Sequence, residues 1–132
     1  KMEEMNGHEM DKIHALFKSQ DERLEAKQRI MELGDLSISD SMGTNLEINA
    51  PGVNKGMGLI QLGRLLGIER EEIMACGDGN NDLMMLKEVG FGVAMANGAD
   101  EVKEVADYIT LSNEEDGVAA VIEKFVLNPE RG

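Results

Sequence analysis

The sequence has few of the residues that cross-link or stiffen a small protein. It contains one cysteine, two prolines, three phenylalanines, one tyrosine and no tryptophan. A single cysteine excludes an internal disulfide framework and is typical of a reducing compartment, so stability must come from packing. The 132 residues, 42% of them apolar, correspond to about one globular domain with a real core.

Basic residues are also scarce. Thirteen lysines and arginines stand against 26 acidic residues, which gives a net charge of −13. This balance argues against nucleic acid, other polyanions and anionic membranes as partners. An acidic protein that binds phosphate needs a metal ion and a few well-placed cations. No apolar run approaches the length of a membrane span and no signal peptide is recognisable, so we expect a cytoplasmic protein without a membrane partner.

One short stretch combines an apolar run with glycines, amides and carboxylates. Ile73–Cys76 is short and apolar, which predicts a buried parallel strand, and Gly77-Asp78-Gly79 predicts the turn at its carboxyl end. Ligands bind at such strand ends in open α/β sheets. Asn80 or Asn81 can then cap a helix over residues 82–89.

The side chains of this turn suit a metal and phosphate site. Asp78 and Asp82 can converge on one hard cation, and the amide of Asn81 can donate to an anionic oxygen. The alternative is that these residues only cap a helix and form a turn. A calcium loop is excluded, because Leu83 and Val89 stand where its glycine and its bidentate glutamate belong.

The first fifty residues predict an antiparallel sheet with a helix on one face. The expected elements are a strand over 12–18, a charged helix starting at Ser19 or Asp21 and ending at Gly34, and strands over 36–39 and 45–48 joined by a turn around Met42. Leu24, Gln28 and Met31 form the thin apolar stripe expected to face the sheet. His8 and His14 lack a second ligand at metal spacing, so neither indicates a metal site.

Beyond the connector Ala50-Pro51-Gly52, helices alternate with short apolar strands, which indicates a parallel α/β sheet. The pattern predicts a helix capped by Asn54 or its neighbour, strands over 91–95 and 108–110, a short helix between them and a last helix capped by Asn113 or Asp116. Lys55 lies in the first turn of the Asn54 helix, where a cation opposes the helix dipole. Such a lysine is either simply solvated or faces an anion.

Several residues are expected to fill the core. Leu59, Leu62 and Leu66 share one face of the Asn54 helix, and the glycines at 56, 58 and 63 in the same helix indicate close packing or a ligand nearby. In the last helix the expected face comprises Val118, Val121, Ile122 and Phe125. Core packing is likewise the favoured role of Cys76, Met84, Met85 and Met95.

Four motifs together resemble the haloacid dehalogenase superfamily, and more closely its Cof-type sugar-phosphate phosphatases. They are Lys55, the segment Gly77-Asp78-Gly79-Asn80-Asn81-Asp82, the segment Gly92-Val93-Ala94-Met95, and the run from Ser112 to Val118. The resemblance is strongest after Asn45. It implies an α/β fold with a partial Rossmannoid parallel sheet: residues 1–50 as the end of an α+β cap domain and residues 51–132 as the carboxyl-terminal half of the catalytic core.

The resemblance also implies a chemistry. Small phosphorylated metabolites such as sugar phosphates would be hydrolysed through an aspartyl-phosphate, with Mg²⁺ as cofactor. Lys55 would contact the phosphate and the attacking carboxylate, Asp78 would bind Mg²⁺ directly, Asn81 would contact phosphate or substrate, and Asp82 would support the metal site. A carboxylate nucleophile needs such cations to overcome repulsion from the phosphate.

The sequence departs from this family at one decisive point. The nucleophile and general acid of the family are two aspartates separated by one residue, and no Asp-x-Asp occurs here. We therefore expect the carboxyl-terminal half of a larger enzyme, inactive without its amino-terminal half, with an unpaired sheet edge that favours association. The alternatives are a non-catalytic remnant that binds a metal or partner and, less favoured, the phosphorylation domain of a cation-pumping ATPase.

Overall fold

The computed structural model describes residues 11–40 and 43–128. The chain divides into two compact units, Lys1–Val53 and Asn54–Gly132, called here the amino-terminal and carboxyl-terminal units. Among the helices described, none is long and apolar enough to cross a membrane.

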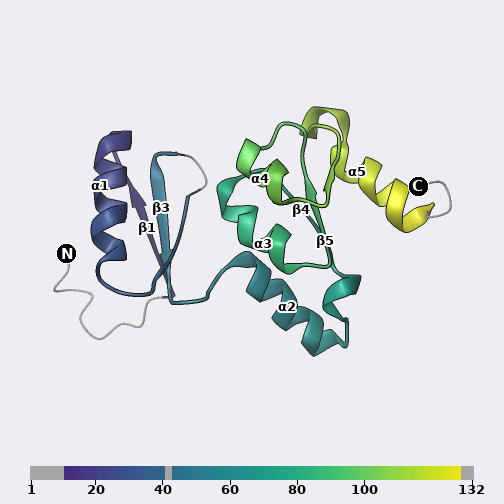
Figure 1. Ribbon diagram of the computed structural model, residues 1–132, viewed down its shortest axis with the longest axis horizontal. Coiled ribbons are helices and arrows are strands. Elements are labelled where there is room, and N and C mark those ends of the chain that lie inside the picture. Colours follow the sequence, from purple (N-terminus) through teal and green to yellow (C-terminus); the bar gives the residue numbers. More distant parts are fainter. Residues whose placement is uncertain (1–10, 41–42, 129–132) are drawn as a thin grey trace. The chain divides into compact units, whose positions relative to one another are not determined.

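The amino-terminal unit is a three-stranded antiparallel sheet with one helix (Figure 1). Its elements are β1 (Lys12–Leu16), α1 (Gln20–Met31), β2 (Ser37–Ser39) and β3 (Asn45–Asn49), and β3 is the central strand. Ser19 caps α1, because its side chain accepts a hydrogen bond from the Glu22 N–H. The order of elements is the one that the sequence predicts.

The predicted apolar stripe of α1 is wrong. Leu24 and Met31 are 50% and 62% exposed, whereas Arg23 is buried. The guanidinium of Arg23 lies 3.0 Å from the Asp40 carboxylate, so an ion pair replaces the expected leucine contact. The long aliphatic stem of arginine can pack like an apolar side chain while its charge is neutralised at the tip.

The expectations for His8 and for the turn at Met42 concern residues that lie outside the described ranges. His14 is exposed on β1, and its Nε2 lies 3.0 Å from the Asn45 amide nitrogen.

The carboxyl-terminal unit is built on a parallel sheet with the strand order β4-β5-β6. Its strands are β4 (Met74–Gly77), β5 (Phe91–Ala94) and β6 (Tyr108–Ile109). The α-helices are α2 (Lys55–Leu66), α3 (Leu83–Glu88), α4 (Asp100–Val105) and α5 (Gly117–Ile122), which continues as a π-helical turn over Glu123–Leu127. Three short 3₁₀ turns cover Arg70–Glu72, Asn80–Asp82 and Asn113–Glu115. The predicted parallel α/β sheet is confirmed.

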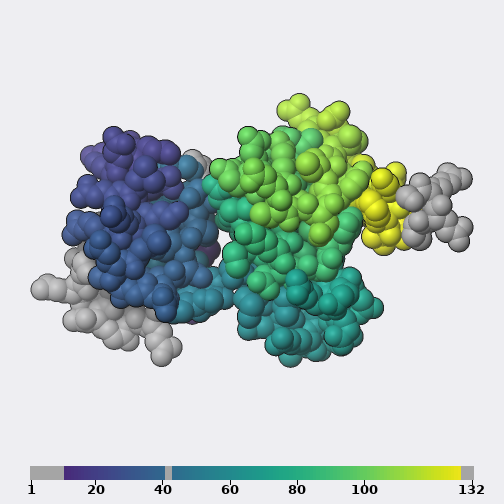
Figure 2. Space-filling model, viewed as in Figure 1, coloured from purple at the N-terminus to yellow at the C-terminus, as the bar shows by residue number. Residues whose placement is uncertain are grey.

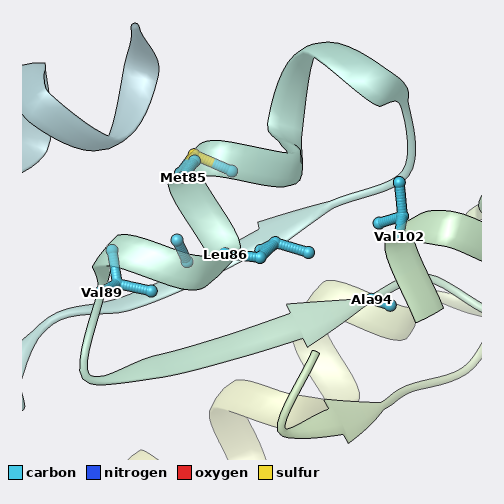
Figure 3. Close-up of a cluster of buried hydrophobic side chains, with 6 residues drawn as sticks. Met85, Leu86, Val89, Ala94 and Val102 are labelled. Atoms are coloured by element: carbon cyan, nitrogen blue, oxygen red, sulfur yellow. The ribbon is translucent and has the colours of Figure 1, made fainter. Parts of the chain in front are cut away.

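Helices cover both faces of this parallel sheet. Ala75 of β4 and Ala94 of β5 belong to a buried cluster with side chains of α3 and α4 (Figure 3). The cluster comprises Ala75, Met85, Leu86, Val89, Ala94 and Val102. On the other face, Phe91 and Tyr108 contact Phe125, with ring centroids 5.0 and 5.1 Å from it. Burial on both faces explains why the strands are apolar.

The helix α2 packs through one of its three predicted leucines: Leu59 is partly buried against the core cluster, as predicted. Leu62 and Leu66 are 51% and 63% exposed, and α2 forms part of the surface in Figure 2, in teal below α3. Its buried positions are Gly56 and Gly63. A Cβ at Gly56 would lie 2.9 Å from the Glu88 Cβ, so glycine lets α2 approach α3 closely. The predicted close packing thus holds at these two glycines and not at Gly58, where a Cβ would meet nothing within 4 Å.

Other core predictions are mixed. Met85 and Met95 are buried as expected, whereas Met84 is 45% exposed. In the last helix Val121 is buried, but Val118 and Ile122 are 45% and 37% exposed. Within the described residues β4 pairs with β5 alone, so its other side is an open sheet edge.

Candidate functional site

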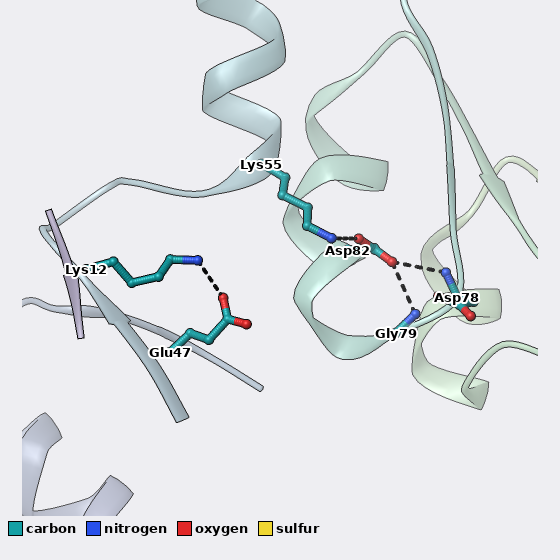
Figure 4. Close-up of polar contacts among 6 residues, drawn as sticks. All are labelled: Lys12, Glu47, Lys55, Asp78, Gly79 and Asp82. Atoms are coloured by element: carbon teal, nitrogen blue, oxygen red, sulfur yellow. Dashed lines mark hydrogen bonds and ion pairs between the residues drawn. The ribbon is translucent and has the colours of Figure 1, made fainter. Parts of the chain in front are cut away.

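Asp82 lies at the centre of the acidic turn and is buried. It ends the 3₁₀ turn Asn80–Asp82 that follows β4. Its Oδ2 accepts hydrogen bonds from the backbone N–H groups of Asp78, at 3.1 Å, and Gly79, at 3.2 Å (Figure 4). The prediction that Asn80 or Asn81 caps the following helix is therefore wrong: the aspartate reaches back to the turn instead.

Lys55 reaches the same carboxylate from another helix. Its Nζ lies 2.5 Å from the other oxygen of Asp82, Oδ1 (Figure 4). Lys55 is the first residue of α2, and the Asn54 side chain caps that helix by accepting from the Met57 N–H at 3.0 Å. The lysine side chain is 51% exposed and that of Asp82 is 8% exposed, so the pair joins the solvent side of the site to its interior.

Asp78 stands at the carboxyl end of β4 and is exposed. Both backbone polar groups of Asp78 form hydrogen bonds: its N–H donates to the Asp82 carboxylate, and its carbonyl accepts from the Ala99 N–H at 2.9 Å. Its carboxylate has no hydrogen bond or ion pair with any described residue, which leaves both oxygens available to a ligand.

A cavity of about 350 Å³ lies beside these groups. It is lined by Lys55, Cys76, Gly77, Asp78, Asp82, Met85, Met95 and Val118. Three of the four predicted site residues therefore share one cavity. Asn81 does not line it; it is half-buried in the 3₁₀ turn, with its Oδ1 on the side of Gly79.

Two glycines make the arrangement sterically possible. A Cβ on Gly77 would stand 2.6 Å from the Asp82 Cβ, closer than any real contact. A Cβ on Gly98, in the loop after β5, would stand 3.1 Å from the Asp78 Cα. Any side chain at Gly77 would thus push Asp82 away from the strand end.

Cys76 is half-buried rather than fully buried and faces this cavity. Partial burial raises the pKa of its thiol above the ordinary value, because desolvation disfavours the thiolate. The thiol therefore contributes a small, mostly uncharged wall to the cavity.

Sequence reasoning missed two features of the site. The first is the inward orientation of Asp82, whose two carboxylate oxygens both form hydrogen bonds within the chain. No sequence pattern indicates that this aspartate is buried next to two glycines. The second is the wall formed by Met95, which directly follows β5, and by Val118, which lies in the first turn of α5. Met95 ends the strand predicted over 91–95, and Val118 begins the helix predicted after the strand over 108–110. Their places could have indicated this wall, since carboxyl ends of parallel strands meet at one edge.

Comparison with known protein families identifies the class of protein. A haloacid dehalogenase-like hydrolase family model matches residues 1–122, and the chain belongs to this family. The predicted relationship is confirmed.

Individual relatives agree with this assignment. The chain is 44% identical over 125 residues to 5-amino-6-(5-phospho-D-ribitylamino)uracil phosphatase YcsE of Bacillus subtilis, an alignment covering 95% of this chain and 50% of that protein. A haloacid dehalogenase-like hydrolase from B. subtilis matches with a TM-score of 0.85 and 30% identity, over 94% of this chain and 45% of the other. A HAD subclass IIB sugar phosphatase matches with a TM-score of 0.84 and 30% identity, over 93% and 46%. The chain thus spans about half the length of these relatives.

Proposed function

We propose that this chain supplies the metal- and phosphate-binding half of a Mg²⁺-dependent phosphatase that hydrolyses small phosphorylated metabolites such as sugar phosphates. The observation that carries the proposal is the Lys55–Asp82 pair at 2.5 Å, anchored to the turn beside the free carboxylate of Asp78. Membership of a hydrolase family and the likeness to named phosphatases support the reaction type.

The donor set fits Mg²⁺. This ion is usually held by one or two carboxylates, with waters and substrate phosphate oxygens completing the octahedron. Asp78 offers an unengaged carboxylate, and the described residues contain no group of three His, Cys, Asp or Glu side chains that could hold a metal alone. A Mg²⁺ site in which Asp78 is the ligand from this chain agrees with the free carboxylate and with the absence of a larger ligand group among the described residues. Bound Mg²⁺ would neutralise phosphate charge and polarise the phosphorus–oxygen bonds.

Lys55 and Asp82 have separate tasks in this proposal. The half-exposed ammonium of Lys55 faces the cavity and binds a phosphate oxygen whose negative charge rises during transfer. Asp82 is a positioning residue: one of its carboxylate oxygens accepts from Lys55, and the other accepts from the backbone of the turn that carries Asp78. It therefore supports the metal from behind rather than binding it directly. A contact of the Asn81 amide with phosphate or substrate rests on the family resemblance alone, since Asn81 does not line the cavity.

The attacking carboxylate comes from polypeptide outside this sequence, which has no Asp-x-Asp. That carboxylate forms a bond to phosphorus while the ester phosphorus–oxygen bond breaks, and the departing alkoxide takes a proton from the second aspartate. Water then hydrolyses the aspartyl-phosphate, which releases inorganic phosphate and regenerates the carboxylate. The 132-residue chain alone is accordingly inactive.

A hybrid enzyme tests the proposal. In the hybrid, this chain replaces the matching 125-residue segment of the B. subtilis phosphatase YcsE. Phosphate release from a panel of sugar phosphates is measured at several Mg²⁺ concentrations for the hybrid, the chain alone and the unmodified relative. We expect Mg²⁺-dependent turnover by the hybrid and none by the chain alone.

An Asp78→Ala hybrid supplies the decisive control. Loss of the ligand should abolish turnover at low Mg²⁺ while thermal unfolding shows an intact fold. Near-normal turnover by this variant, or comparable rates for the chain alone, would overturn the proposal.

A further inference from the structure

The loop after β5 is attached to the backbone of Asp78. The Ala99 N–H donates to the Asp78 carbonyl at 2.9 Å, and Gly98 packs against the same residue. Gly98 is buried, and its own N–H closes a turn to the Met95 carbonyl at 2.9 Å. The position of Asp78 therefore depends on where this loop lies as well as on β4.

The same loop is tied on its outer side by Asn97. The side-chain Oδ1 of Asn97 accepts a hydrogen bond from the Asn113 N–H at 2.8 Å. Asn113 begins the 3₁₀ turn between β6 and α5, so this bond joins the loops that follow two neighbouring strands. Asn97 is exposed and belongs to no apolar cluster, so its side chain can be removed without opening the core.

We propose that Asn97 is a positioning residue for Asp78, acting through Gly98 and Ala99. The inference rests on the proposed function, in which Asp78 binds Mg²⁺. A chain of contacts runs from the Asn113 N–H to Asn97, along the backbone to Ala99, and from the Ala99 N–H to Asp78. Functional groups need neighbouring contacts that hold their geometry within about half an ångström, and this tie supplies one.

Amide hydrogen exchange of the chain itself tests the tie without metal. In Asn97→Ala the Asn113 N–H loses its acceptor, and we expect its exchange to accelerate about fivefold, the effect of one ordinary hydrogen bond. If Asn97 holds the loop on Asp78, the Ala99 N–H accelerates as well. Asn97→Asp keeps an acceptor oxygen of the same geometry and should restore protection at both amides.

Metal dependence in the hybrid enzyme tests the consequence. Asn97→Ala should raise the Mg²⁺ concentration that gives half-maximal turnover about fivefold, with a nearly unchanged rate at saturating Mg²⁺ and reversal in Asn97→Asp. The matched control is Asn128→Ala, which removes another exposed asparagine that donates one hydrogen bond, to the Glu123 carbonyl at 3.3 Å. It should change neither the exchange of Ala99 nor the Mg²⁺ requirement.

The outcomes separate the inference from the function on which it rests. Faster exchange at Asn113 with unchanged exchange at Ala99 overturns the inference, because Asn97 then holds only the Asn113 turn and not the contact with Asp78. An unchanged Mg²⁺ requirement in Asn97→Ala also overturns it. Failure of the proposed function looks different: it appears as Asp78-independent turnover in a hybrid whose Asn97 is intact.

Discussion

The two units of this chain bury different kinds of side chain. Among the described residues of the amino-terminal unit, Leu46 is the one fully buried apolar side chain, and its companions in the interior are Arg23 and Asn45. The carboxyl-terminal unit buries a set of nine apolar residues: Ala75, Met85, Leu86, Val89, Val93, Ala94, Met95, Val102 and Val121. The carboxyl-terminal unit also buries Asp82 and Thr110, so the difference between the units lies in the amount of apolar packing.

The architectures explain the contrast. An antiparallel sheet can leave one face in water, whereas a parallel sheet needs cover on both faces. The helix α1 covers its sheet with a mostly polar sequence, and the parallel sheet lies between α3 and α4 on one face and α5 on the other. A rigid apolar base of the second kind suits a site that must keep Asp78 in place.

The two lysine–carboxylate pairs in Figure 4 give the largest expected difference. Lys55→Met in the hybrid should reduce turnover by orders of magnitude, since it removes the cation that we propose binds the phosphate. Lys12 pairs with Glu47 at 2.7 Å in a more exposed setting. Lys12→Met should cost at most about 1 kcal/mol of stability, as surface pairs do.

Steady-state kinetics and urea unfolding of both variants check this expectation. A Lys55→Met hybrid with turnover within tenfold of the parent would place the phosphate-binding cation elsewhere.

Core truncations compare the two interiors directly. Leu86→Ala should destabilise the carboxyl-terminal unit by about 2–5 kcal/mol, because Leu86 is 2% exposed and its removal leaves a cavity. Leu46→Ala should affect mainly the amino-terminal unit, which has little other apolar packing to retain. Residue-resolved hydrogen exchange in urea distinguishes the two effects.

Leu65→Ala is the matched control, because Leu65 is 85% exposed on α2 and should change stability by less than about 0.5 kcal/mol. Equal loss of protection in both units for either core variant would show that the units unfold together.

Helix caps provide a smaller and closer comparison. Ser19 caps α1 and Asn54 caps α2, so alanine at either position should cost about 1 kcal/mol of unfolding free energy. Asn54→Ala should in addition lower hybrid turnover, since that cap fixes the turn from which Lys55 extends. Thermal unfolding and kinetics are measured together, and equal effects of both variants on turnover would contradict the link to Lys55.

The smallest effect concerns one exposed carboxylate in the carboxyl-terminal unit. Hydrogen bonds from the Ser112 side chain, at 2.6 Å, and from its backbone lower the pKa of Glu115 below the ordinary value of 4.5. A lowered folded pKa stabilises above the unfolded pKa, and this contribution is lost as the pH falls through the folded pKa.

Ser112→Ala should therefore raise the pKa of Glu115 toward 4.5, which an NMR titration of the side chain measures. An unchanged titration would mean that the serine hydroxyl does not hold this carboxylate in solution.

Pattern reasoning succeeded for elements and failed for the faces of helices. The alternation of helices with short apolar strands predicts the parallel sheet, and Asn54 and Ser19 are found at the predicted helix starts. The predicted stripe through Leu24 is wrong, because Arg23 with its ion pair is buried instead. The predicted leucine face of α2 holds at Leu59 and fails at Leu62 and Leu66, because glycines let α2 approach α3 closely. Hydrophobic periodicity predicts neither a buried arginine in an ion pair nor a helix contact through glycines.

The site shows the same division. The place of Asp78 and Asp82 after β4 follows from the sequence, since an acidic turn after a buried strand indicates a ligand site. The direction of Asp82 does not, because local rules for helix caps favour the two asparagines. The choice depends on the lack of side chains at Gly77 and on the proximity of Lys55.

By itself, the sequence determined the parallel sheet, the acidic turn at its carboxyl edge and the family, since these depend on local patterns of apolar, glycine and carboxylate residues. Only the tertiary structure decided that Asp82 turns inward and Asp78 outward. Lys55 and Asp82 are 27 residues apart, and their meeting depends on the close packing of α2 against α3. Long-range contacts of this kind arise from shape complementarity between elements, which no local sequence pattern encodes.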